Sequence, residues 1–558
     1  MAIEVYFFSP EVSSGSLPLP SPILPASTRT PILRQACSWH PSMNRKRRRQ
    51  KGQEAGPPPA SSPFLDLTRH ENRSWFLPVL GMAGLLMGLL LFDANLSLTG
   101  DNAQFINLGR SLAEGHGLAS TIGDEPKPHI KYPFGFPLLL AVVHLIFPGH
   151  LAALKGLVIL LYAASIPLVY LFARRWASAP IALGVSALCL LSPPLLDYSH
   201  QVMSEIPYLA FSLPALLLLQ RAQESKAFSA LALATVAVMA AYYVRSAGIV
   251  LIGAAIFFLL LHRRWRQAGL VAVGSFLLAL PWHLRNAAHG GNPYIDQLLS
   301  INPYRPHLGA LTFAALAERI AANLELYGLY IIPDILFPGL AGGNPFVGLA
   351  ISGLVLYALV SGLARRQLPA VYLACYLGLC ILWPVVWTDT RFLVPAVPLL
   401  FFAMLTSSAE LLQRVVRWIG VKSPQPGMAL LFLVPFAANI LATRDLAGRM
   451  GELPASYGNY FAAAEWIRDN TDPQAKVACR KPFLMNAISH RKAAGYIWKG
   501  PEEVLADFQQ KGIKIVVVDQ LGFRSTPEFL VPAVNARMDR FEIVHIVPDP
   551  DTYILKFK

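Results

Sequence analysis

Long apolar runs recur along most of the chain, and short polar segments separate them. A helix that crosses a bilayer needs roughly 17–25 mostly apolar residues. By this measure the pattern predicts about eleven membrane-spanning helices, although several of the runs are short. The predicted spans are Trp75–Phe92, Leu154–Phe172, Ala179–Leu196, Pro207–Leu219, Ala227–Tyr243, Gly248–Leu261, Ala268–Trp282, Phe346–Leu363, Pro369–Val386, Phe392–Leu412 and Gly427–Ala442.

One further apolar segment, Tyr132–Phe147, is short and opens with two prolines and a glycine. If this segment crossed the membrane, the basic clusters after it would change sides. If it only dips in or lies at the surface, every strong basic cluster falls on one side, which the positive-inside rule makes the cytoplasmic side. We therefore expect a multi-pass protein of the cell (inner) membrane with its N-terminus inside and its C-terminus outside. The clusters are Arg45–Arg49, Arg174-Arg175, Arg221 to Lys226, His262–Arg266, Arg365-Arg366 and Arg414 to Lys422.

The chain divides into three parts by composition. Residues 1–74 form a basic cytoplasmic arm without an apolar core; residues 1–42 are either a genuine disordered tail or an extension ahead of a start at Met43. Residues 75–442 hold the spans, with a first outer loop at 93–153. Residues 443–558 have soluble character and predict a small α/β domain outside the membrane. Its predicted elements are the helices Phe461–Arg468 and Pro501–Lys511 and the strands Ile513–Asp519 and Thr552–Phe557.

Composition narrows the class of protein further. Hydrophobic residues make up 54% and charged residues 14% of the 558 residues, whereas a soluble globular chain has about 25% charged residues. The net charge of +14 lies in short clusters between apolar runs and not in one polar domain, which argues against nucleic acid as a partner. The five cysteines form neither a disulfide framework nor a zinc pattern. Asp549-Pro550-Asp551 formally matches a metal-binding DxD but is better explained as a turn between strands.

Two acidic residues lie at span edges on the predicted outer side. Asp101 precedes a short amphipathic helix, where it is either an N-cap or a base for a hydroxyl group, or both. Glu205 lies just before Ile206-Pro207, where a span begins, and an acid there is commonly a capping charge. Paired carboxylates can orient a nucleophile, remove its proton or hold a metal. The two together are therefore more informative than either alone.

Basic residues gather on the same predicted side. Each has a plain alternative: Lys131 as a snorkelling lysine, and Arg245 as an interfacial arginine satisfied by lipid headgroups. Charge close to the apolar layer is costly and is a functional hypothesis by default. Cations around acids would suit a phosphate beside a reacting hydroxyl. The candidate phosphate- or substrate-binding residues are Lys131, Tyr132, Arg245, His283, Arg285 and Arg391.

Several segments together resemble the GT-C glycosyltransferases, which use lipid-linked sugars. The similar branch holds protein O-mannosyltransferases, the lipid A aminoarabinose transferase and lipopolysaccharide-core sugar transferases. The segments are GDNAQFINLGRSLAEGHGL, KYPFGFPLLLA, VYLFARRWASAPIAL, YSHQVMSEIPYLAF, YYVRSAGIVLIGA, RFLVPAVPLL and the tail from YFAAAEWIRDNT through KIVVVD.

The resemblance implies an α-helical polytopic protein with an extracytoplasmic α/β domain. It also implies inverting transfer of a sugar from a polyprenyl-phosphate donor to a hydroxyl of a lipid, glycan or protein. Asp101 matches the first-loop acid of the family, the expected base or acceptor-orienting group, and Glu205 matches the second-loop acid. The branches most similar to this chain do not generally need a metal, so the resemblance implies no metal, and we expect no cofactor.

Two other functions remain open from the sequence. A transporter or flippase of lipid-linked sugars would place its ionisable groups near the middle of the spans, whereas here they lie at the outer edges. A non-catalytic sensor that displays the outer domain would tolerate Asp101→Asn. The sugar, the acceptor and the oligomeric state are not predicted, since no motif in the sequence specifies them.

Overall fold

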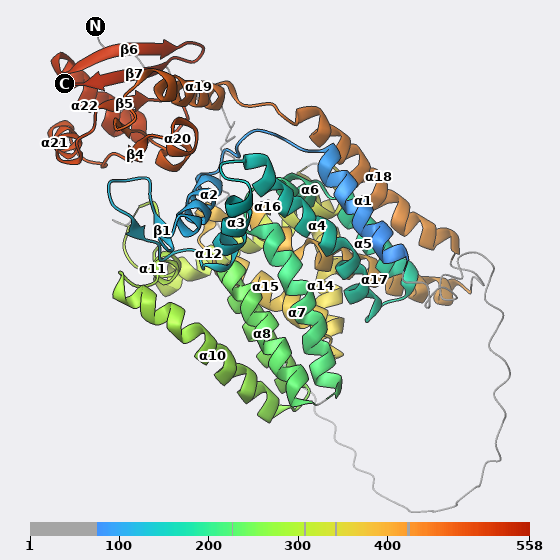
Figure 1. The fold of residues 1–558 in the computed structure, drawn as a ribbon. Coiled ribbons are helices and arrows are strands. Elements are labelled where there is room, and N and C mark those ends of the chain that lie inside the picture. Colours follow the sequence, from blue (N-terminus) through green and yellow to red (C-terminus); the bar gives the residue numbers. More distant parts are fainter. Residues whose placement is uncertain (1–74, 226, 306–307, 341–342, 421–424) are drawn as a thin grey trace, which may run out of the picture.

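The computed structural model describes residues 75–225, 227–305, 308–340, 343–420 and 425–558. The predicted N-terminal arm, with its basic cluster and Met43, lies outside the described residues. The described part consists of a helical membrane domain and a small C-terminal domain built around a sheet (Figure 1).

The helices of the membrane domain cover every predicted span. They are α1 (Phe76–Leu90), α4 (Leu151–Arg174), α5 (Ala179–Leu190), α6 (Pro193–Ser199), α7 (Glu205–Ser225), α8 (Phe228–Val244), η2 (Ser246–Gly248), α9 (Ile249–Leu261), α10 (Trp265–Ala288), α14 (Pro345–Ala364), α15 (Leu368–Leu382), η5 (Val385–Trp387), α16 (Thr390–Leu393), η6 (Val394–Ala396), α17 (Val397–Ile419) and α18 (Gln425–Arg449).

Five of these helices are long and apolar enough to cross a membrane, and a sixth is obtained if the pair α5 and α6 counts as one span bent by 54°. Several others, such as α1 and α15, are apolar but shorter than 18 residues. The breaks have local causes. Proline begins α6 within its first two positions, and the Asn344 side chain accepts hydrogen bonds from the first amides of α14. Gly420, with φ 75°, ends α17 in a left-handed turn.

Small residues allow the helices to pack closely. A Cβ atom at Gly84 of α1 would lie 3.0 Å from the Cα atom of Ala163 in α4, so a larger residue would push the two helices apart. The core of this domain is continuous and includes large buried side chains such as Tyr162, Phe136 and Phe401.

Two segments outside the long helices contain their own short elements. The first, between α1 and α4, holds α2 (Gly100–Ala113), β1 (Ala119–Ser120), β2 (Lys127–Pro128) and α3 (Gly135–Ile146). The second, between α10 and α14, holds α11 (Pro293–Leu299), α12 (Phe313–Glu325), η4 (Leu326–Ile331) and α13 (Ile332–Leu336). The sequence predicts no element between the spans Ala268–Trp282 and Phe346–Leu363. In the structure α10 continues to Ala288, and amphipathic stretches such as α12 form helices against the membrane domain.

The ambiguous segment Tyr132–Phe147 corresponds to α3. Twelve residues of helix are about 18 Å long, well short of the roughly 30 Å of hydrocarbon in a bilayer. The helix packs against α2, α4 and α8. This length agrees with a segment that dips into the membrane or lies along its surface.

The C-terminal domain is an α/β unit. Its elements are α19 (Ala455–Asn470), β3 (Lys476–Ala478), α20 (Pro482–Ser489), β4 (Lys492–Ala494), α21 (Pro501–Lys511), β5 (Ile515–Val518), η7 (Thr526–Leu530), α22 (Val531–Ala536), η8 (Met538–Arg540), β6 (Phe541–Val547) and β7 (Thr552–Phe557). The sheet order is β4-β3-β5-β7-β6, with β4, β3 and β5 parallel and the pairs β5–β7 and β7–β6 antiparallel.

Side-chain alternation along the strands covers both faces of this sheet. Ile515 and Val517 of β5 point into a core with α19 and α20, whereas Val516 and Val518 point into a core with α21 and α22. Because both faces are buried, β5 reads as a continuous apolar run and not as an alternating one. Asp549 and Asp551 lie between β6 and β7, as the turn interpretation predicts.

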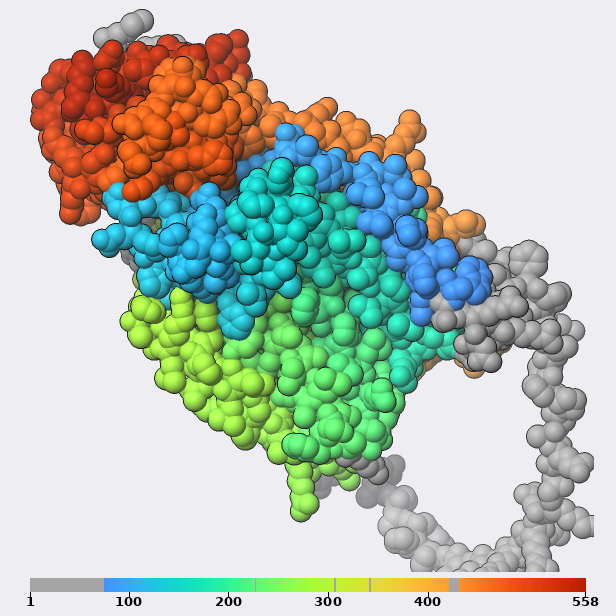
Figure 2. All heavy atoms as spheres, in the orientation of Figure 1, coloured from blue at the N-terminus to red at the C-terminus, as the bar shows by residue number. Residues whose placement is uncertain are grey.

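The C-terminal domain is docked on residues 93–153, the segment predicted as the first outer loop. Leu96 and Ala103 of that loop belong to the same buried cluster as Tyr460 and Val477 of the domain. Figure 2 shows the orange and red domain lying directly against the blue and cyan residues of the loop. Polar contacts add to the docking: the Arg110 guanidinium donates to the Asn486 side chain at 3.0 Å.

Candidate active site

Arg391 joins the two predicted acids into one ionic cluster. Its Nη2 atom lies 2.9 Å from Oδ2 of Asp101, and its Nε atom lies 2.6 Å from Oε1 of Glu205. Arg245 approaches the same Glu205 oxygen at 2.8 Å. Four of the predicted site residues, separated by up to 290 positions in the sequence, therefore meet at one point (391 − 101 = 290). We call these four residues the carboxylate cluster.

Asp101 is held in the first turn of α2. The helix begins at Gly100 and its N-cap is Thr99, without a side-chain capping bond, so the interpretation of Asp101 as an N-cap is wrong. Its carboxylate is used elsewhere: the Tyr132 hydroxyl donates to Oδ1 at 2.7 Å, and Arg391 binds Oδ2. The apolar side of α2 fixes this position, because Phe105 is buried and stacks on the Tyr132 ring with centroids 4.5 Å apart.

Glu205 begins α7 and is fully buried, with a side chain 0% exposed. A buried carboxylate needs charge partners and hydrogen bonds, and the two guanidinium groups supply them. Arg245 is fixed in turn by Ser204, whose hydroxyl lies 2.7 Å from its Nη1 atom. Oε2 of Glu205 and Nε of Arg245 are buried without a hydrogen-bond partner among the residues described.

Lys131 adds a third cation beside the cluster. Its ammonium lies 5.3 Å from the centroid of the Tyr132 ring and 5.9 Å from that of Tyr294. Burial lowers the pKa of Lys131, although the nearby Asp101 opposes this. With Lys131, Arg245 and Arg391 against the two carboxylates, the formal charge is 3 − 2 = +1. The site therefore has one positive charge available for an anion.

The charge state of Asp101 follows from its surroundings. Burial alone would raise its pKa, but Arg391, Lys131 and the hydrogen bond from Tyr132 outweigh burial and hold the pKa below its usual value. The carboxylate is therefore ionised at neutral pH and is available as a hydrogen-bond acceptor.

Arg285 and His283 have other partners. Arg285 donates to the carbonyl oxygens of His129, at 2.8 Å, and of Leu118, at 3.0 Å, so that α10 is tied to the first outer loop. His283 is exposed, and its Nε2 atom lies 3.1 Å from the Tyr242 hydroxyl. Among the residues described, neither forms an ion pair with Asp101 or Glu205.

Sequence reasoning missed Ser204 and Tyr294. Ser204 directly precedes Glu205 and could have been found from that position. Tyr294 lies on α11, for which the sequence predicts no element, and only the fold brings its ring to Lys131. Cation–π contact of this kind needs spatial proximity, which periodicity does not reveal.

Among the described ranges, no group of three or more His, Cys, Asp and Glu side chains could hold a metal ion. Both carboxylates already accept charged or phenolic hydrogen bonds. We therefore assign no metal-binding set.

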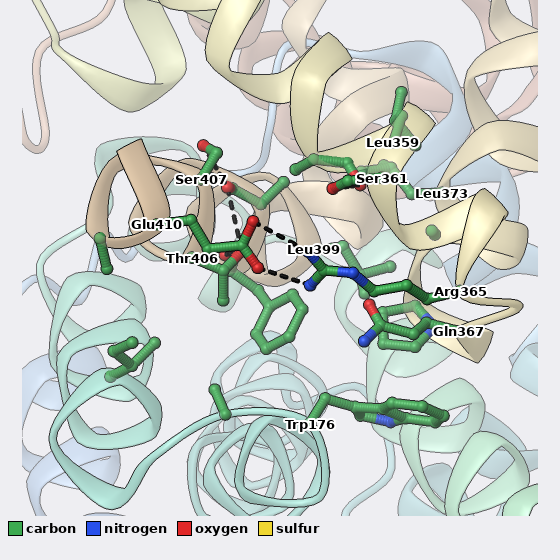
Figure 3. Close-up of a pocket in the computed structure, with 18 of the residues that line it drawn as sticks. Trp176, Leu359, Ser361, Arg365, Gln367, Leu373, Leu399, Thr406, Ser407 and Glu410 are labelled. Carbon is green, nitrogen blue, oxygen red and sulfur yellow. Dashed lines mark hydrogen bonds and ion pairs between the residues drawn. The ribbon is translucent and has the colours of Figure 1, made fainter. Parts of the chain in front are cut away.

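A cavity of ≈ 170 Å³ lies apart from the carboxylate cluster, between α5, α14, α15 and α17 (Figure 3). Its polar side carries Arg365 and Glu410, joined by two hydrogen bonds, of 2.5 and 3.1 Å. Arg391 and Glu410 lie on one apolar helical segment, Thr390–Ile419, and are 19 residues apart, or roughly 28 Å along the helix. The cavity and the carboxylate cluster thus lie near opposite faces of the membrane domain.

Part of the chain is similar to a known protein family. Residues 131–284 match the family described as dolichyl-phosphate-mannose-protein mannosyltransferase. No curated protein sequence matches the chain significantly.

Two solved structures are similar in fold. One is the oligosaccharyltransferase of Archaeoglobus fulgidus tethered to an acceptor peptide, at 14% identity and TM-score 0.55, covering 86% of this chain and 74% of that one. The other is ArnT from Cupriavidus metallidurans bound to undecaprenyl phosphate, at 13% identity and TM-score 0.54, covering 87% and 98%. The predicted fold class is confirmed: the chain has the GT-C fold, with a membrane domain and a small C-terminal sheet domain.

Proposed function

We propose that this membrane glycosyltransferase of the GT-C fold is an inverting enzyme that uses a polyprenyl-phosphate sugar as donor. The acceptor is a hydroxyl group of a lipid, glycan or protein on the extracytoplasmic side. The observation that carries the proposal is Arg391, which binds Asp101 and Glu205 together beside the surplus cation Lys131. The undecaprenyl phosphate bound to ArnT, which shares the fold, supports a donor of this kind.

The proposed reaction is a single displacement. The acceptor oxygen attacks the anomeric carbon, and the bond from that carbon to the phosphate oxygen breaks. The electron pair leaves with the polyprenyl phosphate, and the acceptor proton passes to the Asp101 carboxylate as the new bond forms. Attack from the side opposite the phosphate inverts the anomeric carbon, so no enzyme nucleophile is needed.

The cations have separate tasks in this proposal. Lys131 and Arg391 stabilise the charge that develops on the leaving phosphate. Arg245 and Glu205 hold Arg391 in place, because a guanidinium bound to a buried carboxylate loses little entropy when it meets the phosphate. Arg285 positions the first outer loop that carries Asp101 and Lys131. His283 remains a predicted donor contact.

A flippase is the second candidate, and the position of the charges disfavours it. Arg391 lies at the beginning of its apolar helix and Glu205 at the beginning of α7. A transporter of lipid-linked sugars would need ionisable groups near the middle of the membrane.

Mass spectrometry of glycolipids and glycoproteins from a deletion strain and its parent tests the function. We expect the deletion strain to lack one hexose or pentose, restored by the wild-type gene but not by the Asp101→Asn variant. The proposed activity would be refuted by an unchanged sugar profile together with no release of sugar from polyprenyl phosphate by the purified protein.

The proposed orientation has its own test. The two test variants are Glu125→Cys and Arg366→Cys. Glu125 lies in the first outer loop, Arg366 follows α14, and both residues are exposed. A membrane-impermeant thiol reagent added to intact cells should label the first variant and not the second. The reverse labelling would place the carboxylate cluster inside the cell.

A further inference from the structure

The C-terminal domain carries a second charged group of residues at one edge of its sheet. Strands β4, β3 and β5 are parallel, so their carboxyl ends meet at the same edge. Arg480 and Lys481 follow β3, Trp498 follows β4, and Asp519 follows β5 directly. In open α/β sheets, ligands bind outside the carboxyl ends of such strands. We call Arg480, Lys481, Trp498 and Asp519 the sheet-edge group.

Aromatic rings surround the two cations of this group. The Arg480 guanidinium lies 4.4 Å from the centroid of the Phe523 ring and 5.6 Å from that of Trp498. The Lys481 ammonium lies 5.0 Å from the rings of both Tyr457 and Phe523. Such contacts orient a cation and leave its N–H groups available for an anion.

Two buried polar atoms at this edge have no hydrogen-bond partner within the described ranges. Asp519 is 1% exposed, and although its Oδ1 atom accepts the Leu521 amide at 3.2 Å, its Oδ2 atom accepts nothing among the residues described. The Nε atom of Arg480 is also buried and unpaired. An unpaired buried polar atom is costly, so a native structure retains one mainly where something else binds. Burial raises the pKa of Asp519 to about 6.

The sheet-edge group faces the first outer loop. The Lys481 ammonium donates to the carbonyl oxygen of Leu98 at 2.8 Å, and α2 with Asp101 begins two residues later. Burial lowers the pKa of Lys481 to about 8, while Asp101 is near enough to oppose the shift. The sheet-edge group is therefore next to the carboxylate cluster, on a domain that is separate from the spans that would hold a lipid donor.

We propose that the sheet-edge group binds the acceptor, and that the acceptor is an anionic saccharide. Its phosphate or carboxylate would pair with Arg480 and Lys481, and its sugar ring would pack on Trp498, which is 48% exposed. The unpaired Oδ2 atom of Asp519 would accept a sugar hydroxyl. The role of this saccharide as acceptor rests on the proposed glycosyl transfer. Its binding can be measured without transfer.

Titration of the full-length protein in detergent tests the proposal. The probes are glucose 6-phosphate, glucuronate, inorganic phosphate and methyl glucoside. We expect the two anionic sugars to bind, inorganic phosphate to bind more weakly and methyl glucoside not to bind. The comparison of glucose 6-phosphate with glucuronate distinguishes a phosphate from a carboxylate as the source of charge.

Variants locate the binding. Arg480→Gln should weaken binding of the anionic sugars by about ten-fold or more, because it removes a charge-assisted contact. Trp498→Ala should weaken binding of the sugars but leave binding of inorganic phosphate unchanged. Trp498→Phe should bind the sugars almost as tightly as the wild type. Arg537→Gln is the matched control: this arginine pairs with Asp539 at 3.0 Å and precedes β6, at the opposite edge of the sheet.

The outcomes separate this proposal from the proposed function. Equal affinity of Arg480→Gln and wild type for both anionic sugars would overturn the sheet-edge site, even if transfer is intact. Binding that Arg480→Gln and Trp498→Ala weaken, in a protein that transfers no sugar, would refute the glycosyl transfer and retain the anionic-saccharide site.

Discussion

The membrane domain holds an arginine–glutamate contact near each face, and the two differ in depth. At one face, Arg391 and Arg245 share Glu205, whose side chain is 0% exposed. At the other, Arg365 binds Glu410 through two hydrogen bonds, but the arginine side chain is 49% exposed. The first pair joins a second acid, Asp101, and a surplus cation, whereas the second belongs to the wall of a cavity.

This difference shows at which of the two sites electrostatic interactions contribute most. Burying a carboxylate is costly, and the cost is offset only by several charged partners in good geometry. An exposed pair is screened by water and is worth about 0–1 kcal/mol. The carboxylate cluster is thus the site at which preorganised charge can act on a reaction, and four predictions test this contrast.

The largest effect on stability is expected from Glu205→Gln. The change leaves Arg245 and Arg391 without their shared carboxylate, and breaking a buried pair costs about 3–5 kcal/mol. Thermal unfolding of the purified protein in detergent measures the loss. A variant as stable as the wild type would show that the buried contact contributes nothing.

The stability of the face that holds the carboxylate cluster should depend on pH through His129. His129 lies in the first outer loop and accepts the Tyr132 amide on Nε2 at 2.8 Å, so the fold needs its neutral form. Burial, with Lys131 and Arg285 nearby, lowers its pKa from 6.5 to about 4. Its contribution is therefore complete above about pH 6.5 and is lost as the pH falls through 4, a change of about 3 kcal/mol.

His129→Gln, which can still accept the amide, should remove this part of the pH dependence. Unfolding midpoints at several pH values between 4 and 7.5 give the comparison. Identical pH profiles of the variant and wild type would show that another group is responsible.

Lys131→Gln should impair the reaction with the donor without lowering the stability of the protein. It removes the surplus cation that stabilises the leaving phosphate, and we expect kcat/KM for the polyprenyl-phosphate sugar to fall about ten-fold, or roughly 1.4 kcal/mol. The control is Lys127→Gln, which changes an exposed lysine of the same loop. An equal effect of both variants would indicate general attraction by the loop and no specific role for Lys131.

The smallest effect is expected from Glu410→Gln. Its partner Arg365 is half exposed, so the free energy of unfolding should fall by about 0–1 kcal/mol and transfer should be unchanged. Loss of transfer in this variant would mean that the cavity of Figure 3 takes part in the reaction.

The sequence predicted where most helices lie, but not how long they are or what they contact. Apolar runs placed a helix at every predicted span, and β7 has the predicted bounds Thr552–Phe557. No helix was predicted for α11 and α12, because these helices are short and contain no long apolar run. The sequence predicted that Asp101 lies near a group of basic residues, but not which of them contacts it.

The individual contacts could not be predicted because the two partners of each contact come from distant parts of the chain. Arg391 and Glu205 are 186 positions apart, and Lys481 meets Leu98 across 383. Sidedness places such residues in the same layer, but only the packing of α2, α7 and the C-terminal domain brings the side chains together. Arg285 shows the limit of sidedness: it lies in the expected layer and binds backbone carbonyls instead.

The most direct test of the central claim is the rate of sugar transfer by purified Asp101→Asn in lipid, with a polyprenyl-phosphate sugar and an acceptor identified by mass spectrometry. The amide preserves the size of the side chain but cannot take the acceptor proton. We predict a rate about 10²–10⁴-fold below that of the wild type, with unfolding little changed. A folded Asp101→Asn variant that transfers sugar at the wild-type rate would contradict the account.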